Sequence, residues 1–447
     1  MLTSLPVAQE LGAVITIDPE AMLEQARRLD AGGAPFGTLA GVPIALKDSI
    51  DTVDARTSGG TRALAEHRPA EDAEIVARLR REGAIIGAKC NMHELSFGPT
   101  SNNAFTGPVR NPYDSERTAG GSSGGSAVVV AVGLSPGAVG ADTGGSSRVP
   151  AAFCGVVGLR PSLGRYPAGG MVPISPSRDT AGPIARCVAD IRLLDGVLAG
   201  GPSGPVAEPN IDELRIGLPR EVFLDDLSSE VEEAFAQTVK LLEAVGVRFV
   251  EVDLGESISL ANSAGDVIAQ YEFPDALHQY LRASGSELSV TDVLAEVSSP
   301  DVRGAVEAAV ARRAAGPDAY EEALHRRDAS RELYHRRLDE AGVQAMLHPS
   351  APSSPQRYDL EEIVVGSRRL GAFHAYTWHG NFGGVLGFPA ISLPAGMTND
   401  GMPFGVEIAT RALRDADLFA IALAIERRLP PPTPPSRIPL PVGGSAH

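Results

Sequence analysis

Short apolar runs alternate with longer amphipathic stretches along most of the chain. The runs, rich in valine, isoleucine and alanine, predict buried strands at residues 12–17, 41–46, 84–88, 213–218, 247–252, 345–349 and 384–396. The amphipathic stretches predict helices at 19–30, 71–82, 228–245 and 415–428. Strands and helices that alternate in this order favour an α/β fold, with the strands sandwiched by helices.

One long segment departs from this alternation. Residues 258–342 are mostly helical by pattern, and they come after a glycine- and proline-rich linker at 200–210. We therefore predict a single domain over 1–447, within which residues 205–342 form a mostly helical cap over the functional site. The proline-rich tail at 430–447 cannot continue a helix or a sheet.

The composition is that of a globular protein with an acidic balance. Of the 447 residues, 43% are hydrophobic and 21% are charged, and the formal net charge is −17. Nucleic acids and anionic membranes bind to clustered lysine and arginine, so neither is an expected partner. No apolar run reaches the ~18 residues of a membrane span, and the N-terminus lacks the pattern of a signal peptide.

The cysteines and histidines narrow the chemistry further. Cys90, Cys154 and Cys187 show no Cys-x-x-Cys spacing, which is typical of reduced thiols in a cytoplasmic protein. The nine histidines are scattered without the spacing of metal ligands. We therefore expect neither a metal ion nor another cofactor.

The most distinctive polar feature is a pair of Gly-Gly-Ser turns at 120–122 and 144–146, joined by an apolar stretch at 126–140. Glycine lets the backbone approach a ligand closely, while the serine hydroxyls and the free amides supply polar groups. Such clusters commonly mark surface loops, but this apolar stretch is unlike a solvated linker. A phosphate-binding loop would need a lysine after its glycines, and none lies between residues 90 and 189. The two turns are therefore the candidate site.

The stretch 118–161, with Gly-Val-Pro-Ile-Ala-Leu-Lys-Asp at 41–48, resembles the motif of the amidase signature family. The similarity extends over 12–200 and again over 345–430. The resemblance implies a large mixed β-sheet core sandwiched by helices, with a mostly helical cap insertion. It also implies an amidase that cleaves a carboxylic acid amide to an acid and ammonia or an amine through an acyl-enzyme.

The same resemblance assigns three catalytic roles: Ser146 is the nucleophile, Ser122 the bridging serine, and Lys47 the terminal base. It also implies a cis peptide between Gly121 and Ser122. This Ser-Ser-Lys relay follows the logic of the Ser-His-Asp triad, because a serine hydroxyl needs a base within hydrogen-bond reach. Lys47 must be neutral to accept a proton, so the site must lower its pKa from about 10.4, which desolvation can do.

The turn that ends in the nucleophile offers backbone amides to a tetrahedral oxyanion. We assign this oxyanion hole to Thr143, Gly144, Gly145 and Ser146. Asp142 and Arg148 flank the turn, and we expect them to pair and support it, the alternative being a plain surface salt bridge.

The sequence gives weaker evidence about the preferred substrate. Residues 91–114 are most similar to the branch of the family that hydrolyses indoleacetamide and mandelamide, which implies an aryl-substituted acetamide as the small-molecule substrate. The candidate substrate-binding residues are Met92, Phe97, Gly121, Tyr376 and Trp378. Taken singly, each aromatic side chain among them is more often part of the core. His93 and Glu94 are neighbours in an extended segment and point to opposite sides, which favours structural or pocket-lining roles over an acid–base pair.

A second hypothesis is the glutamine-hydrolysing subunit of a tRNA-dependent amidotransferase. That subunit shares the motif, but its Phe-Ala-Ser-Ser-Leu-Asp-Gln segment is replaced here by the residues at 173–180. A third hypothesis, a non-catalytic binding scaffold, predicts the loss of Lys47, Ser122 or Ser146, and all three are present. We expect a cytoplasmic hydrolase that acts without a companion subunit, as a monomer or a homodimer.

Overall fold

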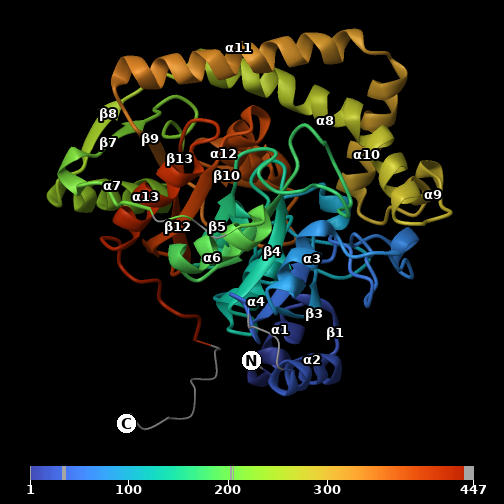
Figure 1. The fold of residues 1–447 in the computed structure, drawn as a ribbon. Coiled ribbons are helices and arrows are strands. Elements are labelled where there is room, and N and C mark those ends of the chain that lie inside the picture. The colour runs from blue at the N-terminus through green and yellow to red at the C-terminus, as the bar shows by residue number, and fades with distance from the viewer. Residues whose placement is uncertain (1, 33–36, 202–203, 205, 437–447) are drawn as a thin grey trace, which may run out of the picture.

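The computed structural model describes residues 2–32, 37–201, 204 and 206–436. A mixed sheet of eleven strands in this part of the chain runs through the molecule in the order β1-β3-β2-β4-β6-β5-β12-β13-β9-β7-β8 (Figure 1). Its strands are β1 (Val14–Ile17), β2 (Pro43–Lys47), β3 (Ile85–Cys90), β4 (Gly137–Asp142), β5 (Val157–Arg160), β6 (Thr180–Ala185), β7 (Arg215–Leu218), β8 (Arg248–Glu251), β9 (Ala345–Pro349), β12 (Ala390–Met397) and β13 (Pro403–Ala409). A separate hairpin pairs β10 (Glu362–Val365) with β11 (Arg368–Gly371).

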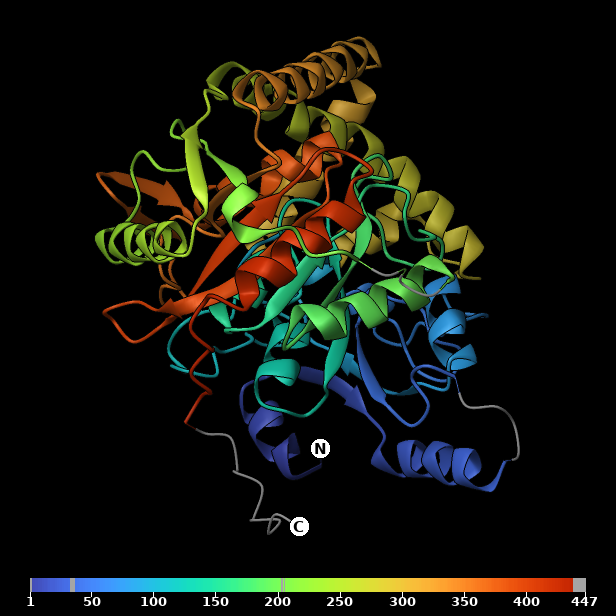
Figure 2. The same ribbon diagram turned by 60° about the vertical axis from the view of Figure 1, so that its left-hand side comes forward.

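Helices cover both faces of this sheet. One core lies beneath α3 (Glu74–Arg81), α6 (Val188–Ala199), α7 (Ser229–Ala244) and α13 (Asp415–Glu426), and Figure 2 shows α6 and α13 side by side over it. The opposite core lies beneath α1 (Leu5–Glu10), α4 (Gly124–Ala131) and α5 (Arg148–Phe153). Two more helices, α2 (Pro19–Ala31) and α12 (Ala372–Leu386), pack against β3 and against α5, respectively. The predicted α/β fold, with a large mixed sheet between helices, is confirmed.

Strand β2 places the candidate base on one particular face of the sheet. Successive side chains of a strand point to opposite faces. Ile44 and Leu46 pack in the core that α3 and α6 cover, whereas Ala45 packs in the core beneath α4. Lys47 follows Ala45 in this alternation, so its side chain enters the face on which α4 lies.

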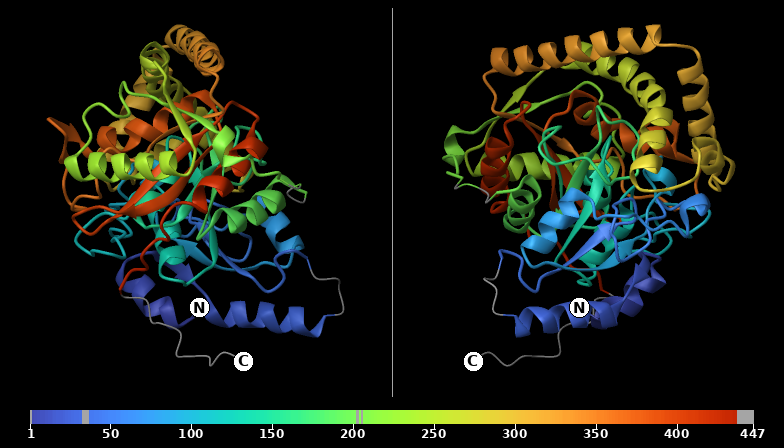
Figure 3. Two further views of the ribbon diagram at one scale, coloured as in Figure 1. Left: turned by 90° about the vertical axis from the view of Figure 1, so that its left-hand side faces the viewer. Right: turned by 45° about the vertical axis from the view of Figure 1, so that its right-hand side comes forward.

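Four helices form the long helical segment: α8 (Gly255–Ala283), α9 (Val290–Ala295), α10 (Pro300–Ala314) and α11 (Asp318–Ala341). The two longest, α8 and α11, run alongside each other over one end of the sheet, and α10 descends beside them (Figure 3). Phe273 and Leu277 of α8 pack with Val302 and Val306 of α10 in a separate core, to which Phe97 and Ile174 also belong. The prediction that 258–342 is mostly helical is therefore confirmed.

One predicted strand is wrong in its bounds. Residues 384–386 end α12, and β12 begins only at Ala390. Gly387 caps the helix in the left-handed conformation, with a φ of 73°, and so turns the chain from helix into strand within a single apolar run. Residues 437–447 of the predicted tail, and residues 202, 203 and 205 of the predicted linker, lie outside the described residues; residues 430–436 form neither helix nor strand.

Candidate active site

The site is assembled at one edge of the sheet, where the parallel strands β2 and β4 both end. Lys47 is the last residue of β2, and the second Gly-Gly-Ser turn follows β4 directly. The first Gly-Gly-Ser turn leads into α4, which covers this face. The Nζ atom of Lys47 lies 2.7 Å from the Oγ atom of Ser122, and both side chains are fully buried. The peptide between Gly121 and Ser122 is cis.

Burial changes the protonation of Lys47. Desolvation lowers its pKa from the ordinary 10.5 to about 7, although Asp142 and Asp179 act in the opposite direction. A substantial fraction of the amine is therefore neutral near pH 7, and the neutral nitrogen can accept a proton from Ser122.

Ser146 lies on the wall of a pocket and is partly exposed, unlike the buried Ser122. A backbone hydrogen bond joins the two turns, because the amide of Ser123 donates to the carbonyl of Ser146 at 3.1 Å. The hydroxyl of Ser123 also donates to the carbonyl of Ala141, at the end of β4, at 3.1 Å. Gly140 leaves room for this approach, since a Cβ atom there would lie 2.7 Å from the Ser123 hydroxyl.

The amides of the second turn differ in availability. Gly145, with a φ of +109°, donates its N–H to the carboxylate of Asp142 at 3.0 Å. In the part of the chain that the structure describes, the amides of Thr143, Gly144 and Ser146 donate to no other protein atom. The N–H of Gly145 already has a charged acceptor and is not available to the predicted oxyanion hole, whereas the other three amides remain candidate donors.

Asp142 and Arg148 form a buried bidentate pair around the turn. The guanidinium donates from Nε to one carboxylate oxygen at 3.0 Å and from Nη2 to the other at 2.9 Å. Burial alone would raise the pKa of Asp142, but Arg148 and Arg160 outweigh it and hold that pKa well below its ordinary value. Arg148 also bonds Glu407 of β13 at 2.5 Å, so the pair ties the turn to the middle of the sheet.

Two residues that we did not single out from the sequence also hold the turn. The hydroxyl of Thr143 donates to Asp179 at 2.6 Å, and two backbone amides of the 174–175 segment donate to the same carboxylate. Arg178 is buried and donates to the carbonyl of Thr143 at 3.3 Å and to that of Gly265, on α8, at 2.8 Å. The Asp-x-x-Gly-Pro sequence that begins at Asp179 was the available signal, but its partners could not be read from it.

The pocket beside Ser146 has a volume of about 560 Å³. Its wall consists of Ser96, Phe97, Gly98, Thr143, Gly144, Ser146, Ile174, Arg178, Asn262, Asp266, Ala269, Gln270, Asp301, Ala305, Phe373, His374, Thr377, Trp378 and Asn381. Two of the five predicted substrate-binding residues, Phe97 and Trp378, lie on this wall. The volume suits a small aromatic molecule, since ligand pockets commonly span ~300–1,000 Å³.

The other three predicted substrate-binding residues do not line the pocket. Met92 is fully buried beside Gly60, and Tyr376 packs edge-to-face on Phe153 with ring centroids 5.0 Å apart. The Tyr376 hydroxyl accepts a backbone hydrogen bond at 2.9 Å, so both ends of this side chain belong to the core. Gly121 faces the 99–101 segment, where a Cβ atom would lie 2.8 Å from the amide of Ser101.

His93 and Glu94 have structural roles, in line with the preferred hypothesis. The Glu94 carboxylate accepts the amides of Ser298 and Ser299, directly before α10, at 2.7–3.1 Å. The imidazole of His93 lies 3.0 Å from Asp301, and its backbone amide donates to the carbonyl of Ser122 at 3.1 Å. One loop thus contacts both the bridging serine and the helical segment.

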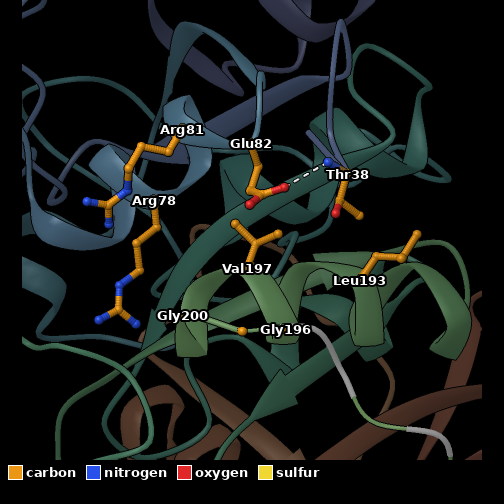
Figure 4. Close-up of a pocket in the computed structure, with 9 residues that line it drawn as sticks. Thr38, Arg78, Arg81, Glu82, Leu193, Gly196, Val197 and Gly200 are labelled. Atoms are coloured by element: carbon orange, nitrogen blue, oxygen red, sulfur yellow. Dashed lines mark hydrogen bonds between the residues drawn. The ribbon is translucent and has the colours of Figure 1, made fainter. Parts of the chain in front are cut away.

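A second pocket of about 560 Å³ lies between α3 and α6 (Figure 4). Glu82 on its wall accepts the amide of Thr38 at 2.7 Å, while Arg78 donates to the carbonyl of Leu198 at 2.7 Å. These charged groups join neighbouring segments, and no predicted catalytic residue lies on this wall. We therefore place the candidate active site at the Ser146 pocket.

Two searches of the described residues bear on other classes of function. No three histidine, cysteine, aspartate or glutamate side chains there are grouped as metal ligands would be. Within the same residues, no helix has both the length and the apolar character that crossing a membrane requires.

Known proteins resemble this chain over almost its whole length. A family model described as amidase matches residues 6–419. An indoleacetamide hydrolase of Agrobacterium vitis is 41% identical, over 96% of this chain and 92% of the relative. A mandelamide hydrolase of Pseudomonas putida is 37% identical, over 95% of this chain and 86% of the relative. A crystal structure of an amidase has a TM-score of 0.85 at 34% identity, covering 96% of this chain and 94% of the other.

A glutamyl-tRNA(Gln) amidotransferase subunit from Carboxydothermus hydrogenoformans is also similar. It is 34% identical over 94% of this chain and 90% of the relative. This identity is lower than that of the two hydrolases, so the comparisons favour the first hypothesis over the amidotransferase.

Proposed function

Because the chain belongs to the amidase family and is an amide-hydrolysing enzyme, we propose that it hydrolyses the primary amide of an aryl-substituted acetic acid to the acid and ammonia. The observation that carries the proposal is the buried 2.7 Å contact between Lys47 and Ser122 beside a pocket that contains Ser146. Aromatic side chains on the pocket wall, Phe97 and Trp378 among them, suit an aryl group. The names of the two similar hydrolases agree with this substrate class.

The reaction begins with two coupled proton transfers. Neutral Lys47 takes the proton of the Ser122 hydroxyl while Ser122 takes that of Ser146, and the Ser146 oxygen forms a bond to the amide carbonyl carbon. The carbonyl π electrons move to oxygen, and the amides of Thr143, Gly144 and Ser146 stabilise that charge. The C–N bond then breaks, and the proton returns from Lys47 through Ser122 to the leaving nitrogen, which departs as ammonia.

Hydrolysis of the acyl-enzyme, the second half of the reaction, uses the same groups in the same order. A water molecule takes the place of ammonia and gives a proton to the Ser122–Lys47 pair as its oxygen attacks the acyl carbon. The bond between Ser146 and the acyl group breaks, the Ser146 oxygen regains its proton, and the carboxylic acid leaves. No cofactor enters either step.

The surroundings of the reaction also form part of the proposal. We infer a cytoplasmic enzyme that acts on a free small molecule without nucleic acid, as a monomer or a homodimer. The net charge of −17 and the free thiols Cys90 and Cys154, which are both buried, support this setting. Light scattering coupled to gel filtration would decide between monomer and homodimer.

Ammonia release tests the function directly. Wild-type enzyme is assayed with phenylacetamide, indole-3-acetamide, mandelamide, an aliphatic amide and glutamine, beside Ser146→Ala and the matched control Ser263→Ala on the exposed side of α8. We expect release from an arylacetamide that Ser146→Ala abolishes and Ser263→Ala retains. Release from glutamine alone, or full activity of Ser146→Ala, would show that the substrate or the nucleophile is wrong.

A further inference from the structure

Helix α8 contributes a row of polar side chains to the wall of the Ser146 pocket. Asn262, Asp266 and Gln270 all line it and are spaced by four residues. Residues at this spacing lie on the same face of a helix, one turn apart. The row therefore extends about 12 Å along the pocket, at 1.5 Å per residue.

The row is close to the groups that would stabilise the oxyanion. Gly265, the residue before Asp266, accepts a hydrogen bond from Arg178 at 2.8 Å, and Arg178 also donates to the carbonyl of Thr143. A single guanidinium thus bridges the catalytic turn and the backbone of α8. An acyl group bound at Ser146 would consequently have the α8 row beside it.

None of these three side chains is tied up in a hydrogen bond within the described protein. Asn262, Asp266 and Gln270 form no side-chain hydrogen bond or ion pair with another described residue. Two other carboxylates of the same helix are engaged: Glu272 accepts from Ser175 at 2.6 Å and from Tyr320 at 2.8 Å, and Asp275 pairs with Arg313 at 2.7 Å. The three residues that face the pocket therefore keep their hydrogen-bonding groups available to a ligand.

The charges around Asp266 indicate what it would bind. Its carboxylate can only accept hydrogen bonds. The guanidinium of Arg178 is buried nearby and donates its hydrogen bonds to the neutral oxygens of Thr143, Gly265 and Asn381. Burial lowers the pKa of Arg178, and the charge of Asp266 is the largest influence in the opposite direction. A positive charge is therefore already present in this part of the pocket, so a neutral N–H or O–H group suits Asp266 better than a second cation.

We propose that Asp266 is a specificity-determining residue, which accepts a hydrogen bond from a neutral N–H or O–H on the acyl group of the substrate. Asn262 and Gln270 flank it and offer both donors and acceptors to the same group. The preferred substrates are then primary arylacetamides with such a donor on the ring or on the α-carbon. This inference rests on the proposed function and specifies its substrate class.

Two substrate pairs that differ only in the donor test the proposal. Mandelamide is compared with phenylacetamide, which lacks the α-hydroxyl, and indole-3-acetamide with benzothiophene-3-acetamide, which lacks the ring N–H. The readout is the ratio of kcat/KM within each pair, measured for wild type, Asp266→Ala, Asp266→Asn and the control Glu256→Gln. A ratio taken within one variant does not depend on how much of that variant folds.

We expect wild type and Glu256→Gln to prefer the donor-bearing member of at least one pair by roughly 10- to 100-fold, the usual effect of a hydrogen bond to a charged group. Asp266→Ala should reduce this preference to about threefold or less, and Asp266→Asn should give an intermediate ratio. Equal rates within both wild-type pairs, or an unchanged preference in Asp266→Ala, would overturn the assignment while arylacetamide turnover still upheld the proposed function. Absence of turnover on all four amides would refute both.

Discussion

The Nζ atom of Lys47 donates a hydrogen bond to the Oγ atom of Ser122 across 2.7 Å, and both side chains are completely buried. Once Nζ has lost a proton, the same contact can run in the other direction, with Ser122 as the donor. The geometry is therefore already that of a base and its hydroxyl, and the protonation of Lys47 decides which direction is in use.

This contact predicts the pH dependence of the enzyme. Burial lowers the pKa of Lys47 to about 7, and only the neutral amine accepts a proton. We expect kcat/KM to rise with pH along a limb with an apparent pKa near 7, to reach a plateau above it, and to fall about tenfold per pH unit well below it. Initial rates on an arylacetamide between about pH 5 and about pH 9 would measure this limb.

Asp51 could produce a similar limb and has to be separated from Lys47. Burial also raises the pKa of Asp51 to about 7, and this carboxylate accepts a hydrogen bond from Tyr280 at 2.8 Å. Asp51→Asn removes that titration and leaves Lys47 in place. The limb should therefore persist in Asp51→Asn, and its disappearance would assign it to Asp51 instead.

The buried amine of Lys47 is expected to support activity and to reduce the stability of the fold. The pKa of Lys47 is about 7 in the folded chain and ordinarily 10.5. Between these two pH values the unfolded chain binds more protons than the folded chain, so the stability of the wild type rises with pH. Lys47→Met removes the buried amine. We expect the variant to be inactive but more stable by about 2–4 kcal/mol at pH 7, with the gain largely lost near pH 10. Urea unfolding at both pH values measures this, and exposed Lys240→Met should change stability little at either.

The candidate catalytic groups could be proposed from the sequence because they are contained in contiguous motifs. Lys47, Ser122 and Ser146 each occupy a recognisable position, and the structure brings Lys47 and Ser122 into contact although 75 residues separate them. The turn's supporting pair, Asp142 and Arg148, is only six residues apart, so local geometry constrains it strongly.

The substrate wall could not be predicted in the same way. Met92 and Tyr376 have the chemistry of ligand-binding residues, but the side of the backbone on which a neighbour packs decides whether such a side chain faces a pocket or the core. Conversely, Asn262, Asp266 and Gln270 have the pattern of a solvated helix face. Only the position of α8 beside the second Gly-Gly-Ser turn makes them part of the pocket, and the contact from Arg178 to α8 joins residues that are 87 positions apart in sequence.

The buried ion network predicts a large loss of stability. Arg148 is completely buried and pairs with both Asp142 and Glu407, so Arg148→Met leaves Glu407 in the core without its arginine and leaves Asp142 with Arg160 alone. We expect a loss of about 3–5 kcal/mol in the free energy of unfolding, measured by urea denaturation. Arg220 pairs with Glu251 on the surface, where both side chains are more than 60% exposed, so Arg220→Met should cost less than about 1 kcal/mol. Equal losses in the two variants would contradict a structural role for the Arg148 network.

The oxyanion amides give a prediction about the rate of the chemical step. A Cβ atom on Gly144 would lie 3.1 Å from the Asn381 side-chain oxygen and 3.3 Å from Nη2 of Arg178, closer than ordinary contact distance. Gly144→Ala therefore displaces the turn or the Arg178 and Asn381 side chains beside it, and Arg178 is itself bonded to the Thr143 carbonyl. Either shift disturbs the amides of the turn. We expect kcat to fall roughly 10²-fold, as when one oxyanion donor is lost, with a smaller change in KM.

Gly304→Ala on α10 is the control for Gly144→Ala, because a Cβ atom there meets nothing within 4 Å. This control should keep the wild-type kcat and gain up to about 1 kcal/mol of helix stability. A Gly144→Ala enzyme with the kcat of wild type would show that these amides do not stabilise the transition state.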